Sequence, residues 1–446
     1  MKEQPVTVFW FRRDLRISDN HGLFKALTSG RPVLPVFVFD TDILNDLEDD
    51  DSCVSFILRQ VQQLQDKFEA DGSSFWIYHG KTLDAFKRLV AEYSVERVFI
   101  NQDYEPYARK RDQEIFEYLG SMGIEMKAFK DQVIFHKNEI LNGDGKPYTV
   151  FTPYSKRWLA KLSEKDWKPY PSEKYLGNLL KMAPLRKFHH VDIGFRRGSL
   201  EIPPQEITPE ILTAYKDKRD FPAVDATSRL GVHLRFGTIS IRQVTAAAVQ
   251  YSSAFLNELI WRNFYMDILW HFPQVEKQSF KPAYDHIAWI NSEKDFARWC
   301  EGTTGFPLVD AGMRQLNQTG FMHNRVRMVT ASFLCKHLLI DWRWGEAFFA
   351  EKLLDYELAS NNGGWQWAAG SGCDAAPYFR VFNPILQQEK FDPELVYVHR
   401  WVPEFGTDHY PKPMVDHRMA RQRAIDTYRA GLVERAGGEA VKSVKK

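Results

Sequence analysis

The densest group of side chains capable of chemistry lies in the segment DYELASNNGGWQW, residues 355–367. Its thirteen residues include two carboxylates, two asparagines, two glycines and two tryptophans. An uncharged carboxamide can donate or accept hydrogen bonds beside a buried ligand without adding charge. Paired glycines let a flat ring or another backbone segment come close. We therefore predict a ligand site here rather than an ordinary structural loop.

Two other segments carry polar groups that could bind a ligand. The segment TSRLG, residues 227–231, offers two hydroxyls, an arginine and backbone N–H groups where a helix is expected to begin. Such groups suit a diphosphate, although an N-cap followed by a turn is the better explanation when this segment is taken alone. In residues 255–265, Glu258, Trp261 and Arg262 are spaced to share one helix face. Alone, that pattern indicates a surface ion pair beside a core tryptophan.

A third segment, GFMHNRVRM, places Asn324, Arg325, Arg327 and Met328 within about one helical turn. The same half of the chain is rich in aromatic residues, because nine of the 13 tryptophans lie after residue 250. We therefore expect the second half to need large, oxidisable side chains that can stack on flat rings.

The elements that must position these groups differ between the two halves. Residues 1–135 alternate apolar strands with amphipathic helices, and this pattern predicts a doubly wound parallel sheet. Thr82 is expected to cap the helix that follows the third strand. The expected strands are residues 6–11, 33–40, 75–80 and 95–101. No GxGxxG follows the first strand and no GxxxxGK[ST] occurs, which excludes a standard nucleotide site in this sheet.

The remaining chain is predicted to form a connector and a helical domain. Residues 136–205 are rich in Pro, Lys and Tyr, and strand patterns nearly vanish after them. The predicted class is therefore α/β plus all-α, with an α/β domain over 1–135, a connector over 136–205 and an all-helical domain over 206–446.

Composition limits the class of protein further. The 446 residues carry a net charge of +1, so any nucleic-acid site must be a local basic patch. The four cysteines lie far apart, which argues against a disulfide framework or a cysteine-ligated zinc site, and we predict no metal. No apolar run approaches the roughly 18 residues that cross a membrane, and the N-terminus lacks a signal-peptide pattern. We expect a cytoplasmic protein.

Five motifs resemble those of the photolyase/cryptochrome family: FRRDLRISDN, TGFPLVDAGMRQL, HNRVRM, DWRWGE and NNGGWQWAAGSGCDAAPYFRVFNP. The resemblance covers essentially the whole chain and is closest to class I photolyases for cyclobutane pyrimidine dimers. It implies an antenna-type α/β domain followed by a helical FAD-binding domain. It also implies a carbon–carbon lyase that passes an electron from light-excited, reduced anionic FAD to a dimer flipped out of single- or double-stranded DNA. We expect a monomer that associates with the nucleoid when it is bound to DNA.

The resemblance implies a role for individual residues. Those expected at the cofactor are Tyr215, Thr227, Ser228, Arg229, Leu230, Arg262, Arg327, Asp355, Glu357 and Asn361. Those expected to act on the dimer are Glu258, Trp261, Asn324, Met328, Trp367 and, at flavin N5, Asn361. Trp365, Trp342 and Trp289 are expected to transfer electrons to the flavin, and Arg325 and Arg380 to contact DNA. Trp299 and Trp344 are expected to be structural.

Several alternatives stay open. A cryptochrome-type photoreceptor without repair activity is the main one, although cryptochromes of plants and animals usually carry Asp or Cys where this chain has Asn361. Photolyases for the 6-4 photoproduct place two histidines where this chain has Asn324 and Met328, which disfavours that activity. The antenna pigment could be a deazaflavin or methenyl-folate, or there could be none.

Overall fold

The computed structural model describes residues 4–433, which divide into two compact units that interleave along the chain. The first unit holds the residues up to 141 together with 155–212 and 228–263. The second unit holds 142–154, 213–227 and the residues from 264 onward. The consecutive boundaries expected at 135 and 205 therefore stay a prediction, and the predicted helical domain runs beyond the described residues.

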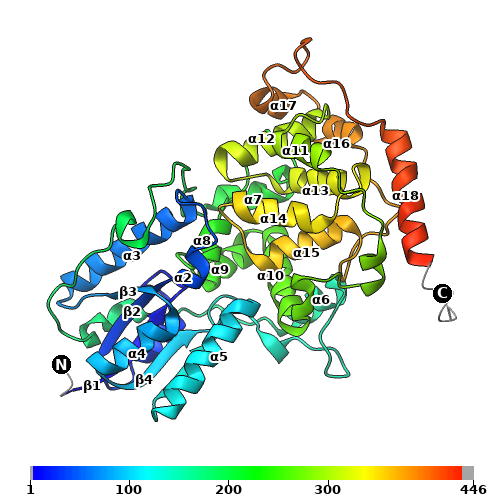
Figure 1. The fold of residues 1–446 in the computed structure, drawn as a ribbon. Coiled ribbons are helices and arrows are strands. Elements are labelled where there is room, and N and C mark those ends of the chain that lie inside the picture. The colour runs from blue at the N-terminus through cyan, green and yellow to red at the C-terminus, as the bar shows by residue number, and fades with distance from the viewer. Residues whose placement is uncertain (1–3, 434–446) are drawn as a thin grey trace. The chain divides into compact units, whose positions relative to one another are not determined.

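The first unit is built on a five-stranded, all-parallel sheet with strand order β3-β2-β1-β4-β5 (Figure 1). This order confirms the predicted doubly wound sheet. The strands are β1 (Pro5–Phe11), β2 (Val33–Asp40), β3 (Trp76–Gly80), β4 (Ser94–Asn101) and β5 (Glu125–Phe129). The edge strand β5 was not expected, because its sequence EMKAF is short and mostly polar or exposed.

Helices cover both faces of the sheet, which is why its central strands are apolar throughout. Phe9 and Phe11 of β1 pack on one face with residues of α1 and α3, whereas Val8 and Trp10 pack on the other with residues of α4 and α5. The helices of this part are α1 (His21–Leu27), α2 (Thr41–Leu44), α3 (Ser52–Ala70), α4 (Thr82–Glu92) and α5 (Pro106–Ser121).

Thr82 does not cap α4, contrary to the expectation. The N-cap residue is Lys81, and the Thr82 hydroxyl instead donates to Asp40 Oδ2 at 2.7 Å. Asp40 ends β2, so this hydrogen bond ties the first turn of α4 to the carboxyl end of the neighbouring strand.

A buried ion-pair network explains why helical residues 228–263 belong to the first unit. Arg16, which follows β1, binds both oxygens of Asp131 at 2.7–2.8 Å. Arg242 of α9 (Ile241–Tyr251) bonds to Asp131 at 2.7 Å and to Asp19 at 2.8 Å. All four side chains are almost fully buried, so each charge is compensated only through the others. Through Arg16 and Asp19, the FRRDLRISDN motif therefore links the segment after β1 to α9 within the first unit.

The rest of the described chain contains helices and connecting loops. Its α-helices are α6 (Phe151–Lys161), α7 (Pro209–Lys218), α8 (Gly231–Arg235), α9 (Ile241–Tyr251), α10 (Ser253–His271), α11 (Glu293–Glu301), α12 (Pro307–Thr319), α13 (Asn324–Ser332), α14 (Trp342–Lys352), α15 (Leu358–Ala369), α16 (Pro384–Phe391), α17 (Val396–Trp401) and α18 (His417–Val433). Short 3-10 turns are η1 (Lys137–Glu139), η2 (Glu164–Asp166), η3 (Ser172–Asn178), η4 (His190–Ile193), η5 (Pro273–Glu276) and η6 (Pro282–His286), and η7 (Phe333–His337) is a π-helical turn. No helix within residues 4–433 is long and apolar enough to span a bilayer.

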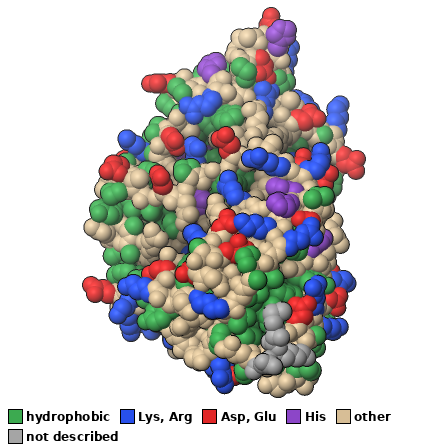
Figure 2. Space-filling view, turned by 90° about the vertical axis from the view of Figure 1, so that its left-hand side faces the viewer, with side chains coloured by type: hydrophobic (Ala, Val, Ile, Leu, Met, Phe, Trp, Pro, Cys, Tyr) green, Lys and Arg blue, Asp and Glu red, His purple; other side chains and the backbone are tan. Residues whose placement is uncertain are grey.

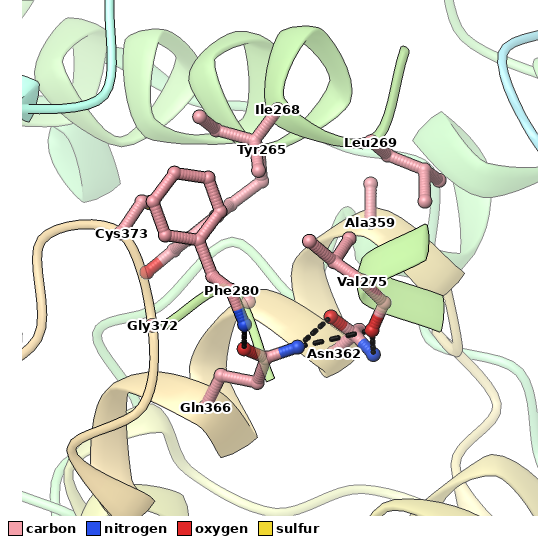
Figure 3. Close-up of a pocket in the computed structure, with 11 residues that line it drawn as sticks. Tyr265, Ile268, Leu269, Val275, Phe280, Ala359, Asn362, Gln366, Gly372 and Cys373 are labelled. Carbon is pink, nitrogen blue, oxygen red and sulfur yellow. Dashed lines mark hydrogen bonds between the residues drawn. The ribbon is translucent and has the colours of Figure 1, made fainter. Parts of the chain in front are cut away.

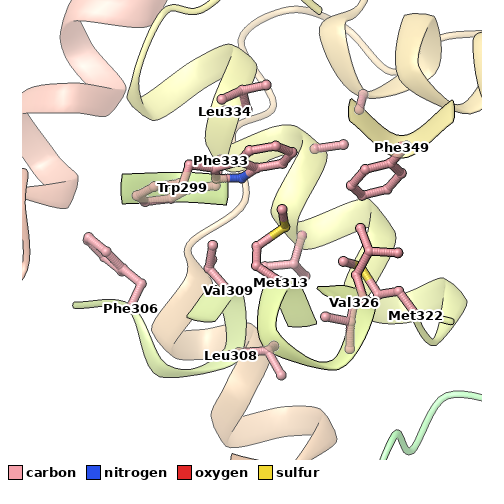
Figure 4. Close-up of a cluster of buried hydrophobic side chains, with 14 of the residues drawn as sticks. Trp299, Phe306, Leu308, Val309, Met313, Met322, Val326, Phe333, Leu334 and Phe349 are labelled. Carbon is pink, nitrogen blue, oxygen red and sulfur yellow. The ribbon is translucent and has the colours of Figure 1, made fainter. Parts of the chain in front are cut away.

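The core of the second unit gathers around α12, α13 and α14 (Figure 4). Asp310 of α12 organises the loop at its edge. Its carboxylate accepts hydrogen bonds from Thr304 N and Oγ1, from Gly305 N and from the Tyr410 hydroxyl, at 2.6–2.9 Å. Burial raises the pKa of Asp310, and these four donors oppose that rise.

Candidate functional site

The Asn361 side chain on α15 has a defined orientation. Its Nδ2 donates to the backbone oxygen of Glu346 at 3.1 Å and to Glu346 Oε1 at 2.9 Å. An amide nitrogen carries two hydrogens, so both are occupied and Oδ1 is the atom that Asn361 presents elsewhere. Asn361 can therefore act as an uncharged acceptor for an N–H group.

Glu346 of α14 holds that amide in place. Burial raises the pKa of its carboxyl group, the hydrogen bonds from Asn361 and Tyr356 lower it, and the nearby Glu276 raises it again. The net shift of the Glu346 pKa is upward, because burial is the largest of these effects.

Arg327 and Asp355, both expected at the cofactor, form an ion pair. Arg327 Nη2 lies 3.1 and 2.9 Å from the two carboxylate oxygens of Asp355, and its Nε donates to the Met322 backbone oxygen at 2.7 Å. Three hydrogen bonds fix the guanidinium, yet a quarter of the Arg327 side chain stays exposed. The pair therefore offers a rigid positive group to a ligand.

The start of α13 depends on a neutral histidine. His323 is the N-cap residue, and its Nδ1 accepts a hydrogen bond from Arg325 N at 3.2 Å. Burial and the nearby Arg327 lower the pKa of His323 to about 4, so the acceptor form persists at neutral pH.

Of the other predicted site residues on α13, only Met328 and Arg325 lie next to each other. Asn324 is exposed, and Met328 Sδ lies 3.8 Å from Arg325 Nη1. Arg325 also pairs with Asp220 at 2.7 Å and stacks over Phe391 at 4.3 Å. Its guanidinium is thus already neutralised by a carboxylate. Arg380, the second predicted DNA contact, is exposed in the loop before α16.

The two glycines of α15 have different surroundings. A Cβ added to Gly363 would lie 2.2 Å from Cδ1 of Tyr265, so the lack of a side chain at this position makes room for the Tyr265 ring. A Cβ added to Gly364 would meet nothing within 4 Å. The space beside the second glycine is therefore open, whereas the first glycine serves packing.

A small pocket that the sequence did not predict lies between α10 and α15 (Figure 3). Its lining is Tyr265, Ile268, Leu269, Val275, Phe280, Ala359, Asn362, Gly363, Gln366, Gly372 and Cys373. Four of them, Ala359, Asn362, Gly363 and Gln366, lie in the segment 355–367 that was predicted to hold a ligand, but on the face of α15 opposite Asn361. The amides of Asn362 and Gln366 form hydrogen bonds to each other and to the backbone of residues 275–280. These amides therefore hold α15 to the segment 275–280.

The predicted electron-transfer tryptophans belong to one hydrophobic cluster. Trp365 and Trp342 are buried in it, and the half-buried Trp289 packs against it. Gly345 lies against the Trp365 ring, since a Cβ there would be 2.1 Å from Cη2. Trp367, expected at the dimer, is half-buried with its ring 6.3 Å from that of Phe382.

The predicted phosphate-binding segment spans both units. Tyr215 and Thr227 belong to the second unit, and residues 228–230 belong to the first. Arg229 has a φ of +49°, a backbone conformation that non-glycine residues seldom adopt and that is common at ligand sites. Ser228 Oγ accepts from Leu230 N at 3.4 Å. The five-residue α8 begins directly afterwards, as expected for a helix start here.

Three half-buried residues of the predicted site lie on α10: Glu258, Trp261 and Arg262. Their spacing predicted that they would share one face of a helix. Arg262 donates to the backbone oxygen of Gln132 at 2.7 Å, so part of its guanidinium binds the first unit's own backbone. Glu357 is buried at the N-cap position of α15, where Ser360 Oγ lies 3.3 Å from its carboxylate.

Two family models match the chain. The model described as DNA photolyase matches residues 7–173, and the model described as the FAD binding domain of DNA photolyase matches residues 255–407. Deoxyribodipyrimidine photo-lyases from Synechococcus sp. and Agrobacterium fabrum are 35% and 36% identical; the alignments cover 93% and 96% of this chain and 95% and 98% of the relatives.

Solved structures give the same result. A class III photolyase from Agrobacterium tumefaciens is 32% identical with a TM-score of 0.83, over 97% of this chain and 98% of that one. An archaeal photolyase from Sulfolobus tokodaii with two FAD molecules is 32% identical with a TM-score of 0.78, over 95% and 99% of the chains. The class I assignment stays a prediction, because one of these relatives belongs to class III. The chain itself belongs to the DNA photolyase family.

Proposed function

We propose that this chain is a deoxyribodipyrimidine photo-lyase, which uses light and reduced FAD to split cyclobutane pyrimidine dimers in DNA. Full-length relatives with this name support the proposal. The observation that carries it within the site is the Asn361 amide. Both of its hydrogens are occupied by Glu346, so it presents an uncharged oxygen. Such an oxygen can accept a hydrogen bond from flavin N5–H without placing a second negative charge beside an anionic ring.

The residues present fit FAD. Bound FAD would supply the light absorption and the electron that opens the dimer. In the second unit, the fixed guanidinium of Arg327 would stabilise the anionic ring, and the open space at Gly364 would admit it. In the first unit, Ser228 and Arg229 would bind the diphosphate. The other residues expected at the cofactor would also contact FAD: Tyr215, Thr227, Leu230, Arg262, Asp355 and Glu357.

The dimer itself would be held by stacking and hydrogen bonds. A pyrimidine dimer pairs badly in a duplex, so its extrusion costs less than that of an intact base pair. The indoles of Trp261 and Trp367 would stack on the extruded bases, while Glu258 and Asn324 would bind pyrimidine edges. Met328 would form a soft wall. Trp365, Trp342 and Trp289 would return the flavin to its reduced state.

DNA binding would depend on a few local cations rather than on the overall charge. Basic and acidic side chains are interspersed over the face shown in Figure 2, and the net charge is +1. Arg380 is exposed, whereas Arg325 must exchange Asp220 for a phosphate. Affinity should therefore fall with salt concentration, with a slope that reflects only a few phosphate contacts.

The test is repair in vitro. Purified protein with chemically reduced flavin is illuminated with blue light together with single- or double-stranded oligonucleotides that contain one thymine dimer, and dimer loss is measured by chromatography. Light-dependent loss is expected, with none in the dark. A protein that binds FAD and leaves the dimers intact would be a photoreceptor instead.

The same preparation tests the remaining expectations. Absorbance in the near-ultraviolet or violet beyond that of FAD would reveal an antenna, and mass spectrometry of the released pigment would separate a deazaflavin from methenyl-folate. Analytical ultracentrifugation is expected to show a monomer. Fluorescence microscopy of a tagged chain is expected to show it over the nucleoid after ultraviolet damage.

A further inference from the structure

A lysine without an acidic partner is buried in the π-helical turn η7. Lys336 has 1% of its surface exposed, and no carboxylate within residues 4–433 forms an ion pair with it. Burial lowers the pKa of its side chain to about 8. A buried ammonium group costs folding free energy unless its surroundings compensate the charge. The groups that surround Lys336 must therefore provide that compensation.

Three other elements of the second unit meet at this ammonium group. Lys336 Nζ donates to the backbone oxygen of Tyr378 at 3.2 Å and lies 4.0 Å from the centre of the Tyr428 ring of α18. A Cβ added to Gly370, the C-cap residue of α15, would lie 3.4 Å from Nζ. A carbonyl oxygen, an aromatic face and the C-terminal end of a helix all favour a nearby positive charge. Lys336 thereby connects η7 to α15, to α18 and to the loop before α16.

That loop carries a residue expected to contact DNA. Tyr378 is followed by Phe379 and Arg380, which are both exposed. Arg380 N donates to the Pro377 backbone oxygen at 2.9 Å, so residues 377–380 form a tight turn. The Tyr378 ring also lies nearly parallel to the Tyr428 ring, with the ring centres 6.1 Å apart. The backbone and the ring of Tyr378 are both held, and Arg380 therefore leaves the turn in a defined direction.

We propose that Lys336 is a positioning residue for DNA binding, because it fixes the turn 377–380 against α15 and α18 and so directs Arg380 towards a phosphate. The proposal rests on the proposed function, in which Arg380 contacts DNA. Lys336 is fully buried, so it acts through the turn and not by binding a phosphate itself. Its loss should weaken binding to damaged and undamaged DNA alike and leave the light reaction of a bound dimer unchanged.

Lys336→Met tests this role, because methionine fills a similar space without the charge or the donor. Holoprotein that carries FAD is mixed in the dark with dimer-containing or undamaged oligonucleotides, and binding is measured by fluorescence anisotropy. The affinity for both is expected to fall roughly tenfold, as for the loss of one phosphate contact. The repair rate at saturating DNA should stay within about twofold of the wild type. Unchanged affinity, or a fall in that rate alone, would overturn the proposal.

Combination with Arg380→Ala shows whether the two residues act together. If Lys336 acts by directing Arg380, Lys336→Met should add little in protein that already lacks the Arg380 side chain. Losses that simply add would mean that Lys336 affects binding by another route, and the proposal would fall. Lys352→Met is the matched control, because it removes a lysine charge that pairs with its neighbour Glu351 on α14. This variant should bind DNA as the wild type does.

Tyr428 offers an independent pair of variants. Its hydroxyl is buried and has no hydrogen-bond partner among the described residues. Tyr428→Phe keeps the aromatic face beside Lys336 and should bind DNA with the wild-type affinity. Tyr428→Leu removes that face and should weaken binding in the same direction as Lys336→Met. Equal affinities of the two variants would contradict the proposed arrangement.

Hydrogen exchange of the turn separates this proposal from the proposed function. Without DNA, the backbone amides of residues 378–380 should exchange faster in Lys336→Met than in the wild type, whereas those of α14 should not change. Unchanged exchange in the turn would reject the positioning role even in a protein that repairs dimers. Wild-type protein that neither binds nor repairs dimer-containing DNA would reject the proposed function, while the exchange data would still report on Lys336.

Discussion

Asn361 shows how one amide can be set by its neighbour. In Asn361→Asp, the side chain loses the two donors that bind Glu346 and places a second carboxyl group beside one whose pKa is already raised. The two groups would share a proton, and the local charge near a bound flavin would change. Blue-light reduction of the variant is therefore expected to accumulate a different flavin redox state, seen in its absorption spectrum.

Glu346→Gln is the control for that variant. Its side-chain oxygen can still accept from Asn361 Nδ2, so the amide keeps its orientation while the titratable group is lost. Its photoreduction products should match those of the wild type. If Asn361→Asp also matched the wild type, the placement of Asn361 at flavin N5 would be wrong.

Loss of Asp310 should lower stability without touching the site. Asp310→Ala leaves Thr304 N, Gly305 N and two hydroxyls without their acceptor in a buried place. The free energy of unfolding is expected to fall by about 2–4 kcal/mol, as measured by urea denaturation. Asp426→Ala, on the exposed face of α18, should change it by less than about 1 kcal/mol.

At the scale of elements, α15 offers a matched pair of substitutions. Gly363→Ala puts a Cβ 2.2 Å from the Tyr265 ring and should destabilise the protein by about 1–3 kcal/mol. Gly364→Ala meets no atom within 4 Å and, as a helix position, should stabilise the protein without FAD by up to about 1 kcal/mol.

Thermal unfolding of the two variants, with and without FAD, checks this pair. FAD content should fall in Gly364→Ala if the cofactor approaches that position, although the apoprotein becomes more stable. Equal effects of the two substitutions would contradict the distinction between a packing glycine and an open one.

The sequence predicts those elements that can be recognised from their own residues alone. Four of the five strands, β1 to β4, were found almost to the residue, because each contains a run of apolar or aromatic residues. β5 was missed because an edge strand can be short and polar, and its pairing with β4 depends on residues distant in sequence. Thr82 was wrongly predicted as an N-cap, because its actual hydrogen-bond partner, Asp40, lies 42 residues earlier at the end of β2.

The site was predictable to a similar extent. The family resemblance placed Arg327 and Asp355 at the cofactor, and the structure shows that the two side chains form an ion pair. Glu346, which orients Asn361, could not be found, because fifteen residues and a turn separate it from its partner. The pocket beside Gln366 was equally hidden, since it needs α10 and α15 to pack together.

For the whole molecule, buried histidines contribute to the response to acid. The pKa of His323 is lowered to about 4 and that of His337 to about 3, both chiefly by burial, from an ordinary 6.5. Between pH 6.5 and 4 the unfolded chain binds protons that the folded chain refuses, so stability falls as the pH drops. Each histidine contributes about 1.4 kcal/mol per pH unit at most. Asp14, whose pKa burial raises to about 6, acts in the opposite direction.

His323→Asn isolates one of these contributions. Asparagine is a good N-cap, so α13 keeps its start while the titrating group disappears. The decline in the free energy of unfolding from pH 6.5 to 4 should be shallower than in the wild type, as measured by urea denaturation at each pH. An unchanged slope would mean that His323 is protonated equally in both states.

The network of Arg16, Asp19, Asp131 and Arg242 has a consequence for how the chain is made. Asp131 and Arg242 are 111 residues apart, so a ribosome needs on the order of 10 s to deliver the second after the first. During that interval Asp19 and Asp131 have one cationic partner, Arg16, but lack the second one, Arg242. Any early stop before α9 would release a fragment with surplus negative charge at its centre, and quality control should clear it quickly.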